Sequence, residues 1–329
     1  MRIRKAVVFR ASSLGDSLMG KYLLENVRAA YPDARVAFVV GSKGDMIRDF
    51  FEAYPWMEVI EASRKKPLGI MRVLTRFFWS DLVVTQYTGK GGAFSTMSKL
   101  MARVLAKPGG LIGFHDSWKW NKVIYSKLLD FSVDRATVEH DRNALRAAGV
   151  PILLPAPTYR FTPVEGVLEK FGLERGNYIA LHLFSGGVKR GLSFDKKKEL
   201  LYAVLQVAQL PVVLTAAPFE AAELAEIAEG LHEVQAVCDS PRELATVLSG
   251  ASSVVSLDTG AAHIAAQIGK PLVVLGTCMG RPWWRKEQYP QNIPFFTRAD
   301  LCTDGHKWVD HPACLNEVAM ESVAAAVIY

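Results

Sequence analysis

The feature that most constrains the fold is an alternation of short apolar runs with longer helical patterns. The runs in the first half are AVVFR (6–10), RVAFVV (35–40), DLVVTQ (81–86) and GLIGF (110–114). Helical spacing follows at about 17–30 and again in AFSTMSKLMARVLA. Strands that are apolar along their whole length are typical of a parallel sheet covered by helices on both faces. GLIGF is the last strand that this pattern predicts in the first half.

The alternation stops at the proline-rich stretch GVPILLPAPTYRFTP and then resumes. Four strands and four helices are expected beyond it: strands at 178–184, 211–217, 252–257 and 271–276, and helices at 193–209, 219–231, 241–249 and 259–268. LNEVAMESVAAAVI predicts one final amphipathic helix. A proline-rich break between similar halves is typical of an interdomain linker. We therefore expect an α/β fold of two doubly wound parallel-sheet domains, 1–155 and 156–329, with a final helix able to pack back on the first.

Open parallel sheets bind ligands at the carboxyl ends of their strands, so a cleft between the two domains is the expected site. The basic N-terminus MRIRKAVVFR contains only a four-residue apolar run, and no uncharged apolar stretch reaches 18 residues. Neither a secretion signal nor a membrane span is therefore expected. The sequence predicts a cytoplasmic protein that is soluble or peripherally bound to a membrane.

Basic residues are concentrated in the first half of the chain. Residues 1–160 hold 25 Lys and Arg against 14 Asp and Glu, whereas residues 161–329 hold 14 against 19. This asymmetry indicates an anionic partner, such as nucleic acid, an anionic lipid or a phosphorylated glycan, with a solvated basic surface as an equally good interpretation. No nucleic-acid recognition motif is present, so we expect no nucleic-acid partner.

The four cysteines, Cys238, Cys278, Cys302 and Cys314, lack C-x-x-C spacing, so no metal site is expected from them. In a cytoplasm all four are expected to be reduced. Cys302 and Cys314 are near enough in sequence to lie close together.

The stretch SSLGD (12–16) follows the first expected strand. Gly15 permits a tight turn into the helix, and the serines can hydrogen-bond the backbone there. Asp16 is either an ordinary helix cap, worth about 1 kcal/mol, or a carboxylate that faces the expected cleft. The stretch lacks the G-x-G-x-x-G pattern, so a nicotinamide cofactor loses its main support.

The stretch SLDTGAAHIAAQIGKP (256–271) places a small-residue helix directly after an apolar strand. A helix N-terminus offers free N–H groups and partial positive charge, and Gly260 and Ala261 leave room for phosphates to approach. The alternative is a tight strand-to-helix connection with Asp258 as its cap.

Two further loops follow strands in the second half. LFSGGVKRG (183–191) either binds a diphosphate, with Lys189 as a point charge, or is a flexible turn with solvated cations. AAPFEAAE (216–223) places Glu220 near a helix start. A carboxylate there can accept both ribose hydroxyls, or it is simply favoured by the helix dipole.

Taken together, these stretches make the chain resemble glycosyltransferase family 9, the ADP-heptose:lipopolysaccharide heptosyltransferase family. SSLGD, YPDARVAFVV, the Lys189 loop, AAPFE and SLDTGAAHIAAQIGKPLVVLG occur in the family's order over nearly the whole chain. The resemblance implies a GT-B fold, in which two Rossmann-like domains face each other across a cleft and bind acceptor and nucleotide sugar respectively. It also implies inverting, metal-independent sugar transfer that needs no cofactor beyond the nucleotide-sugar co-substrate, here expected to be ADP-linked.

The resemblance also implies roles by position. Asp16 resembles the catalytic base. Donor contacts are implied at Ser185 and Lys189 (phosphates), Glu220 (ribose or sugar), Asp258 (sugar), and Thr259, Gly260 and Ala261 (diphosphate). His263 belongs to the same motif and is interpreted as structural, because a histidine one turn into a helix is more often packed than catalytic.

The chain departs from the family pattern at the Lys189 loop, after the third expected strand, and in its sparse C-terminal cysteines. In the family, the loop with this lysine usually continues through a tryptophan and a proline, whereas here it reads KRGLS from Lys189 onward. The segment QYTGKGGAFS stands where D-x-Q-G-x-x-K-S is usual. These departures leave the donor and the acceptor more open than the fold.

The basic first half predicts contacts with an acidic acceptor. SRKK supplies Arg64, Lys65 and Lys66, SWKWNK supplies Lys119 between two tryptophans suited to sugar stacking, and Ser13 is a further expected contact. The helix pattern after SRKK carries arginines on an apolar background. It suits either contact with the anionic inner face of the inner membrane or an ordinary amphipathic helix.

The expected function is therefore transfer of a sugar, heptose from ADP-heptose, onto lipopolysaccharide or a related anionic, lipid-linked glycan. Two alternatives stay open. One is a nucleotide-sugar epimerase of the same architecture, which would act on the donor without an acceptor. The other is a non-catalytic relative that binds glycan or nucleotide.

Overall fold

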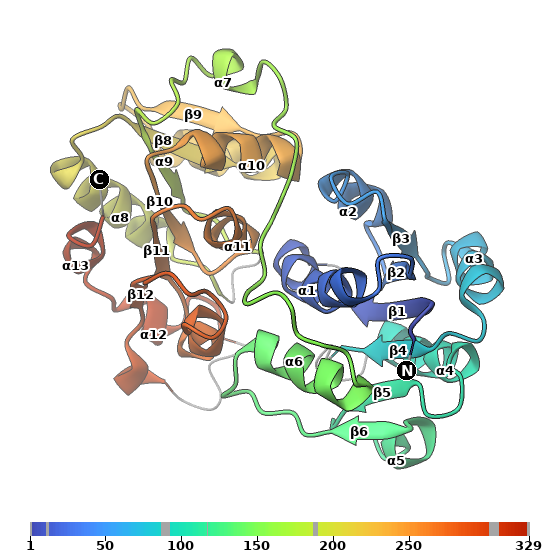
Figure 1. Cartoon of the computed structure of the whole chain (residues 1–329). Coiled ribbons are helices and arrows are strands. Elements are labelled where there is room, and N and C mark those ends of the chain that lie inside the picture. The colour runs from blue at the N-terminus through green and yellow to red at the C-terminus, as the bar shows by residue number, and fades with distance from the viewer. Residues whose placement is uncertain are drawn as a thin grey trace. The chain divides into compact units, whose positions relative to one another are not determined.

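The computed structural model describes residues 2–10, 13–86, 93–116, 118–186, 190–302 and 309–327, without the side chains of residues 93 and 94. The chain divides into two compact units, Met1–Pro157 and Thr158–Tyr329 (Figure 1). Each unit is built on its own six-stranded parallel sheet. The expectation of doubly wound parallel sheets is thereby confirmed.

The sheet of the first unit has the strand order β3-β2-β1-β4-β5-β6. Its strands are β1 (Lys5–Arg10), β2 (Arg35–Val40), β3 (Met57–Glu61), β4 (Leu82–Thr85), β5 (Leu111–Phe114) and β6 (Lys127–Leu129). In the register of the central strand, Val7 pairs with Ala37 on one side and with Val83 on the other. The strand that precedes SSLGD is therefore enclosed by neighbours.

Helices cover both faces of this sheet. They are α1 (Leu14–Ala30), α2 (Gly44–Phe50), α3 (Pro67–Phe77), α4 (Ala93–Leu105), α5 (Asn121–Ile124) and α6 (Thr137–Ala148). Val7 and Phe9 pack with Phe77 of α3 and Leu105 of α4 in one core, which also includes Tyr125 at the end of α5. α1 and α6 pack against each other on the opposite face (Figure 1). Burial on both faces explains why the strands are apolar along their whole length.

The second unit repeats this architecture, with the strand order β12-β11-β10-β7-β8-β9. Its strands are β7 (Ile179–His182), β8 (Val212–Ala216), β9 (Val234–Val237), β10 (Ser253–Leu257), β11 (Leu272–Leu275) and β12 (Phe295–Phe296). Its helices are α7 (Val167–Lys170), α8 (Phe194–Val207), α9 (Ala221–Ile227), α10 (Pro241–Gly250), α11 (Gly260–Gln267), α12 (Ala313–Asn316) and α13 (Met320–Ala324), with the 3-10 turns η2 (Pro218–Glu220), η3 (Cys278–Trp284) and η4 (Ala299–Leu301).

The core of the second unit also has two layers. Val255 and Leu257 of β10 pack with Leu200 of α8, Leu224 of α9 and Val323 of α13 on one face. α10 and α11 pack together and belong to the other layer (Figure 1). Within the described residues, α13 packs against α8 of its own unit.

The start of α10 follows from its sequence. α10 begins after Ser240, whose hydroxyl accepts a hydrogen bond from the Glu243 N–H at 3.2 Å, with Pro241 at the first helical position. Both features are favourable at a helix N-terminus.

Four strands were not predicted, and the expectation that GLIGF ends the first sheet is wrong. The missed strands are β3, β6, β9 and β12, which are the edge strands of the two sheets. Their sequences, MEVIE, KLL, VQAV and FF, are short or mixed in polarity. An edge strand needs less apolar surface than a central one, so its sequence signal is weaker.

The single final helix is also corrected. LNEVAMESVAAAVI contributes to two short helices, α12 and α13, instead of one. Its buried residues include Val318 and then Met320, a spacing of two that breaks the helical period. Asn316, at the end of α12, lies at the break, and its amide oxygen accepts the Ser193 N–H at 2.8 Å.

The proline-rich stretch is extended and bonded to each unit in turn. The N–H groups of Leu153 and Leu154 donate to the Asn26 side chain of α1. Further on, the Tyr159 N–H donates to the Gln267 carbonyl and the Val164 N–H to the Thr246 hydroxyl. The connection therefore has regular hydrogen-bond partners even though it has no helix or strand.

The expectation that all four cysteines are reduced is wrong for two of them. Cys302 forms a disulfide with Cys278, whereas Cys314 is buried and free, as is Cys238. The fold brings η3 next to the segment after η4, a proximity across 24 residues that spacing alone does not reveal. Among the helices described, none is both long and apolar enough to cross a membrane.

Candidate functional site

Each sheet has a point where the chain reverses the direction in which it adds strands. In the first unit, β1 is followed by β2 on one side, and β4 later joins its other side. In the second unit, β8 joins one side of β7 and β10 the other. In open parallel sheets ligands bind beside the carboxyl ends of the strands at such switch points. The SSLGD motif follows β1, and the SLDTGAAH motif begins in β10 and continues into α11.

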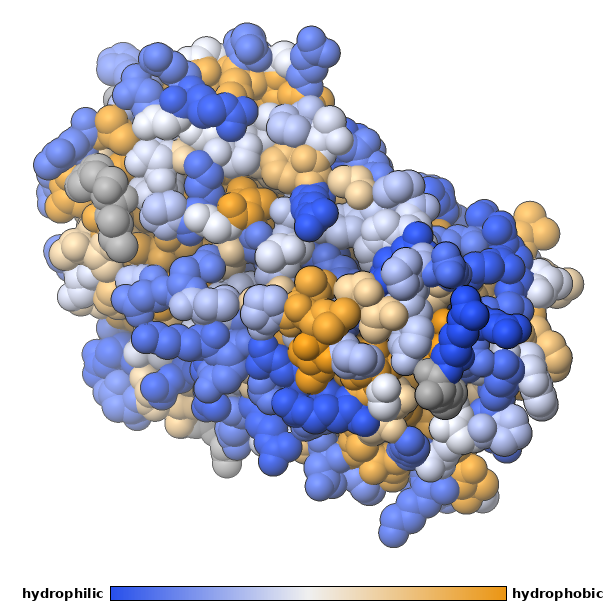
Figure 2. All heavy atoms as spheres, in the orientation of Figure 1, coloured by the Kyte–Doolittle hydropathy of each residue, from blue (hydrophilic) through white to orange (hydrophobic). Residues whose placement is uncertain are grey.

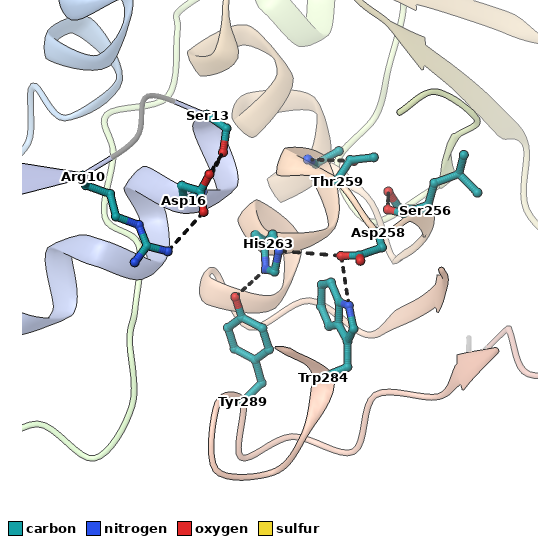
Figure 3. A network of polar contacts seen from close by, with 11 residues as sticks. Arg10, Ser13, Asp16, Ser256, Asp258, Thr259, His263, Trp284 and Tyr289 are labelled. Atoms are coloured by element: carbon teal, nitrogen blue, oxygen red, sulfur yellow. Dashed lines mark hydrogen bonds and ion pairs between the residues drawn. The ribbon is translucent and has the colours of Figure 1, made fainter. Parts of the chain in front are cut away.

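Asp16 lies in the first turn of α1, at the switch point of the first unit. Ser13 is the N-cap of this helix, and its hydroxyl oxygen accepts the Asp16 N–H at 3.1 Å. The Ser13 hydroxyl also lies within hydrogen-bonding contact of Asp16 Oδ2, and Arg10 Nη2 donates to Asp16 Oδ1 at 3.1 Å (Figure 3). The Asp16 side chain remains 36% exposed. Ser13 is therefore the cap, and Asp16 is a held carboxylate open to solvent.

Arg10 connects Asp16 with a second, buried carboxyl group. The Arg10 side chain is only 6% exposed, and its positive charge also lowers the pKa of Asp141. Burial is the larger effect on Asp141 and raises its pKa to about 7. Asp141 Oδ1 accepts a hydrogen bond from Gln86 at 2.8 Å, and Gln86 also donates to the Gly20 carbonyl. No local sequence pattern predicts this group, because Arg10, Gln86 and Asp141 lie far apart in the chain.

Three predicted donor motifs lie at the carboxyl ends of neighbouring strands of the second sheet. β10, β7 and β8 are neighbours, and all run parallel. Asp258 directly follows β10, Ser185 lies shortly after β7, and Glu220 lies shortly after β8. The strand order thus gathers residues that are up to 73 positions apart in sequence. The edge has the position expected of a nucleotide site in a doubly wound sheet.

The start of α11 has the features of an anion site. Thr259 is its N-cap, with the hydroxyl accepting the Ala261 N–H at 3.3 Å. Gly260 and Ala261 follow and bring no bulky side chain to the N-terminus. The remaining N–H groups of the first turn and the helix dipole favour a phosphate there.

Asp258 is almost enclosed, with a side chain only 7% exposed. Its Oδ1 accepts the Trp284 Nε1–H at 3.1 Å (Figure 3). A methyl group at Gly280 would collide with its Oδ2, so the absence of a side chain there makes room for the carboxylate. Burial raises the pKa of Asp258 to about 6, while Arg190 and the Trp284 hydrogen bond oppose this rise.

His263 joins the same buried group from one turn inside α11. Its ring stacks on that of Trp284, with centroids 4.7 Å apart, and its Nδ1 lies 2.7 Å from the Tyr289 hydroxyl. Its Nε2 lies 3.8 Å from Asp258 Oδ1. At 3% exposure, His263 is packed inside the unit, as expected for a structural role. Sequence reasoning missed Trp284 and Tyr289, for which the aromatic pair in RPWWR was the available signal.

The other predicted donor residues are less fully defined. Glu220 Oε2 accepts the Ala217 N–H at 2.8 Å within its own turn, and burial raises the pKa of Glu220. Ser185 is half-buried, and Lys189 lies outside the described residues. Arg190 is described and exposed, and its positive charge lowers the pKa of Asp258.

The predicted acceptor cations differ in their surroundings. Lys66 forms ion pairs with Asp45 and Glu61, each at 3.1 Å. Lys119 is exposed, and its ammonium group lies 5.9 Å from the centroid of the Trp120 ring. Arg64 and Lys65 are exposed on the turn before α3. Neither switch point includes these four cations, which lie in loops around α3 and before α5.

Within the described parts of the chain, no group of three or more His, Cys, Asp or Glu side chains is placed to hold a metal ion.

Comparison with known proteins gives a family match and a fold. Residues 169–277 match the sequence model of glycosyltransferase family 9 (heptosyltransferase). No curated protein matches the sequence.

Solved structures match over nearly the whole chain. The glycosyltransferase family 9 structure from Veillonella parvula DSM 2008 has a TM-score of 0.70 at 14% identity, covering 99% of this chain and 98% of that one. ADP-heptose LPS heptosyltransferase II from E. coli has a TM-score of 0.69 at 17% identity, covering 98% and 97%. E. coli heptosyltransferase WaaC with ADP-2-deoxy-2-fluoro heptose has a TM-score of 0.66 at 17% identity, with the same coverage.

The solved structures show the shared GT-B-like fold, because their identities are too low to show more. The family match lies on the second unit and includes Ser185, Glu220 and Asp258. It is the same family that the sequence motifs predict. The match to the model of glycosyltransferase family 9 thus covers residues 169–277, and the GT-B-like fold extends over nearly the whole chain.

Proposed function

We propose that this chain transfers heptose from ADP-heptose onto lipopolysaccharide or a related anionic glycan. Asp16 carries the proposal, because its carboxylate is held by Ser13 and Arg10 yet stays open to solvent at the switch point of the first unit. The names of the E. coli neighbours, an ADP-heptose LPS heptosyltransferase and a heptosyltransferase with an ADP-heptose analogue, support the choice of donor.

The proposed reaction is an inverting displacement at the anomeric carbon of the donor. An acceptor hydroxyl oxygen forms the new bond to this carbon while its proton passes to the Asp16 carboxylate. The bond from the anomeric carbon to the phosphate oxygen breaks, and the nucleoside diphosphate leaves with the electron pair. A positioned general base contributes roughly 10²–10⁴-fold to such a step.

The second unit binds the leaving group in this proposal. The N-terminus of α11, with Thr259, Gly260 and Ala261, and the β7 loop, with Ser185 and Lys189, neutralise the diphosphate charge. Fixed donors aimed at developing charge are often the largest single contribution to catalysis. Glu220 contacts the ribose or sugar and Asp258 the sugar. The reaction needs no metal and no cofactor beyond the nucleotide sugar.

The first unit binds the acceptor in this proposal. Ser13, Arg64, Lys65 and Lys119 contact an anionic, lipid-linked glycan, with Lys66 held nearby by its acidic neighbours. An acceptor of this kind is presented at a membrane surface, so the protein works in the cytoplasm at the inner face of the inner membrane.

Product analysis tests the proposal. The protein is incubated with ADP-heptose and a heptose-deficient lipopolysaccharide, with and without EDTA. Mass spectrometry should show the acceptor gaining one heptose in both samples, and NMR should show an inverted anomeric configuration. ADP-glucose and UDP-, GDP- and CMP-linked sugars serve as donor controls.

Three results would overturn the proposal. Transfer from another nucleotide sugar in preference to ADP-heptose would contradict the proposed donor. Loss of product in EDTA, restored by a divalent cation, would contradict the metal-independent mechanism. Conversion of the donor's sugar to its epimer without an acceptor would show an epimerase instead of a transferase.

A further inference from the structure

The first unit has a surface on which apolar side chains and unneutralised cations are interleaved. Eight of the fifteen large hydrophobic side chains that are exposed in the described residues lie between positions 68 and 123. They are Leu68 and Met71 of α3, Phe78 and Trp79 after it, Leu100 and Val104 of α4, and Trp120 and Val123 at α5. We call this surface, together with Arg64, Lys65, Arg103, Lys119 and Lys122, the α3–α5 face.

The three helices present this surface on the same side of their sheet. Val73 and Phe77 of α3, Leu105 of α4 and Tyr125 after α5 all pack into one core against the sheet. α4 contacts both α3 and α5. The residues on the opposite sides of these helices therefore point away from the sheet in common. Figure 2 shows hydrophobic residues at the margin of the first unit where Figure 1 places α3.

The backbone holds the two aromatic residues after α3 beside the end of α4. The Ser80 N–H donates to the Leu105 carbonyl at 2.7 Å, and the Lys107 N–H donates to the Ser80 carbonyl at 2.9 Å. Trp79 has φ of 60°, a left-handed conformation that costs free energy for a residue with a side chain. Trp79 is nevertheless 53% exposed, so burial of its ring within this unit does not offset that cost.

The charge of this region is almost entirely positive. Between Glu61 and Asp130 the sequence has twelve Lys and Arg and only two acidic residues, Asp81 and Asp116. Both of these are turned inward. Asp81 accepts from Lys107 and from the backbone of the β1 region, and Asp116 accepts from Lys99 and Asn121.

Some of the twelve cations are neutralised and others are not. Arg72 and Arg76 pair with Glu58, and Lys66 pairs with Asp45 and Glu61. The five cations of the α3–α5 face have no ion pair among the described residues. Apolar side chains therefore stand among cations that lack acidic neighbours.

We propose that the α3–α5 face docks the protein on a membrane surface rich in anionic phospholipid. Leucine, methionine and tryptophan side chains enter the boundary between headgroups and acyl chains, where tryptophan is especially favourable. Each Lys or Arg near an anionic surface strengthens binding about fivefold at low salt, so the five cations together should strengthen it by more than about a hundredfold. The inference rests on the proposed function for the lipid-linked acceptor, but the docking itself needs no acceptor.

The same observations argue against other occupants. A second copy docked through this face would bring five cations against five, which is unfavourable. A nucleic acid would use the cations but would leave the aliphatic side chains, such as Leu68 and Val123, without a favourable partner.

Vesicle co-sedimentation without donor or acceptor tests the docking. The full chain should sediment with phosphatidylglycerol-containing vesicles and not with pure phosphatidylcholine vesicles, and rising salt should release it. L68S/W79S/L100S and R103E/K122E should each weaken binding by at least tenfold. Y202S/V207S, which removes two exposed apolar side chains of α8 in the second unit, should bind as the unchanged protein does.

Several outcomes would overturn the proposal. These are no sedimentation with either vesicle, equal sedimentation with both, or unchanged binding by the two α3–α5 variants. A dimer in solution that L68S/W79S/L100S dissociates would also overturn it, because a second copy would then be the occupant. Thermal unfolding of each variant should match that of the unchanged chain, since all of these side chains are exposed.

A kinetic measurement separates this inference from the proposed function. L68S/W79S/L100S should lose transfer to acceptor embedded in vesicles while keeping transfer to detergent-dispersed acceptor. Docking without transfer to either acceptor would contradict the proposed function alone. Equal transfer by this variant to both acceptors would contradict docking alone.

Discussion

The two units place carboxylates at corresponding edges of their sheets but in opposite surroundings. The Asp16 side chain is 36% exposed and held by Ser13 and Arg10. The Asp258 side chain is 7% exposed, and it accepts the Trp284 N–H. An exposed, ion-paired carboxylate can meet an incoming hydroxyl. The enclosed Asp258 carboxylate is instead fixed in position by the loop that carries Trp284.

In each unit the charge of an arginine also lowers the pKa of a buried carboxyl group. In the first unit the charge of Arg10 lowers the pKa of Asp141, and in the second unit the charge of Arg190 lowers that of Asp258. In both units burial is the stronger effect and raises the pKa. Arg10 is buried and also bonds Asp16, whereas Arg190 is exposed. The first unit therefore keeps its cation beside the proposed base, and the second leaves its cation accessible to a ligand.

The largest expected difference between Asp16 and Asp258 is in turnover, which should depend most strongly on Asp16. Asp16→Asn should lower kcat roughly 10²–10⁴-fold, because the amide cannot take the acceptor proton. ADP affinity, measured by calorimetry, and the melting temperature should change little, since asparagine retains an acceptor oxygen for Ser13 and Arg10.

Asp195→Asn is the matched control. Asp195 also lies in the first turn of a helix, α8, and is exposed. This variant should turn over at the unchanged rate. Near-full activity in Asp16→Asn would show that Asp16 only stabilises the helix start.

The next effect is on the pH dependence of stability. The pKa of Asp141 is raised to about 7 from 3.8, so the folded protein holds a proton there that the unfolded chain releases between these values. This group therefore makes stability fall as pH rises from about 4 to about 7, by up to a few kcal/mol. The stability of Asp141→Asn minus that of the unchanged chain should therefore be larger at pH 8 than at pH 5, as measured by thermal unfolding.

Asp81→Asn provides the contrasting control. Lys107 and two backbone N–H groups hold the pKa of Asp81 below its usual value, against the effect of burial. The ionised Asp81 carboxylate therefore stabilises the fold fully at both pH 5 and pH 8, so Asp81→Asn should lose the same free energy of unfolding at the two pH values. An equal shift at both pH values for Asp141→Asn would mean that Asp141 ionises normally.

A smaller effect is expected from the hydrogen bond to Asp258. Trp284→Phe keeps an aromatic ring but removes the Nε1–H donor, which leaves a buried carboxylate short of a partner at a cost of about 1–3 kcal/mol. The pKa of Asp258, about 6 in the unchanged chain, should rise further. The loss of stability should therefore be larger at pH 8, where the group is ionised, than at pH 5.

Trp283→Phe tests whether the effect is specific to this donor. It changes the neighbouring tryptophan, and its stability loss should be independent of pH. The same pH dependence in both variants would show that general packing, and not the bond to Asp258, is responsible.

The smallest effects come from the two helix caps. Ser13→Ala and Thr259→Ala should each cost about 1 kcal/mol of stability. Ser13→Ala should also lower kcat several-fold, since Asp16 loses one of its two partners, while Thr259→Ala should weaken ADP binding instead. Ser240→Ala, at the cap of α10, should cost similar stability without either kinetic change. Exchange of the two kinetic effects would reverse the roles of the units.

The sequence predicted the central strands well and the edge strands poorly. Strands such as 35–40 and 253–257 are buried on both faces, and their continuous apolar runs are hard to mistake. β3, β6, β9 and β12 lie at the edges and need fewer apolar residues. The same reasoning explains the divided C-terminal helix, whose apolar content was visible but whose break lies at Asn316, which contacts the distant Ser193.

Short motifs determined which residues stand at the strand ends, and one of them lies within the segment that matches glycosyltransferase family 9. SSLGD and SLDTGAAH each lie within a few consecutive residues, so their turn and helix-start chemistry is local and can be derived from the sequence. Only the tertiary structure decided that β7 lies between β10 and β8, that Arg10 and Gln86 approach Asp141, and that Trp284 encloses Asp258. These contacts join residues far apart in the chain, and their burial and pKa values depend on packing that no local pattern records.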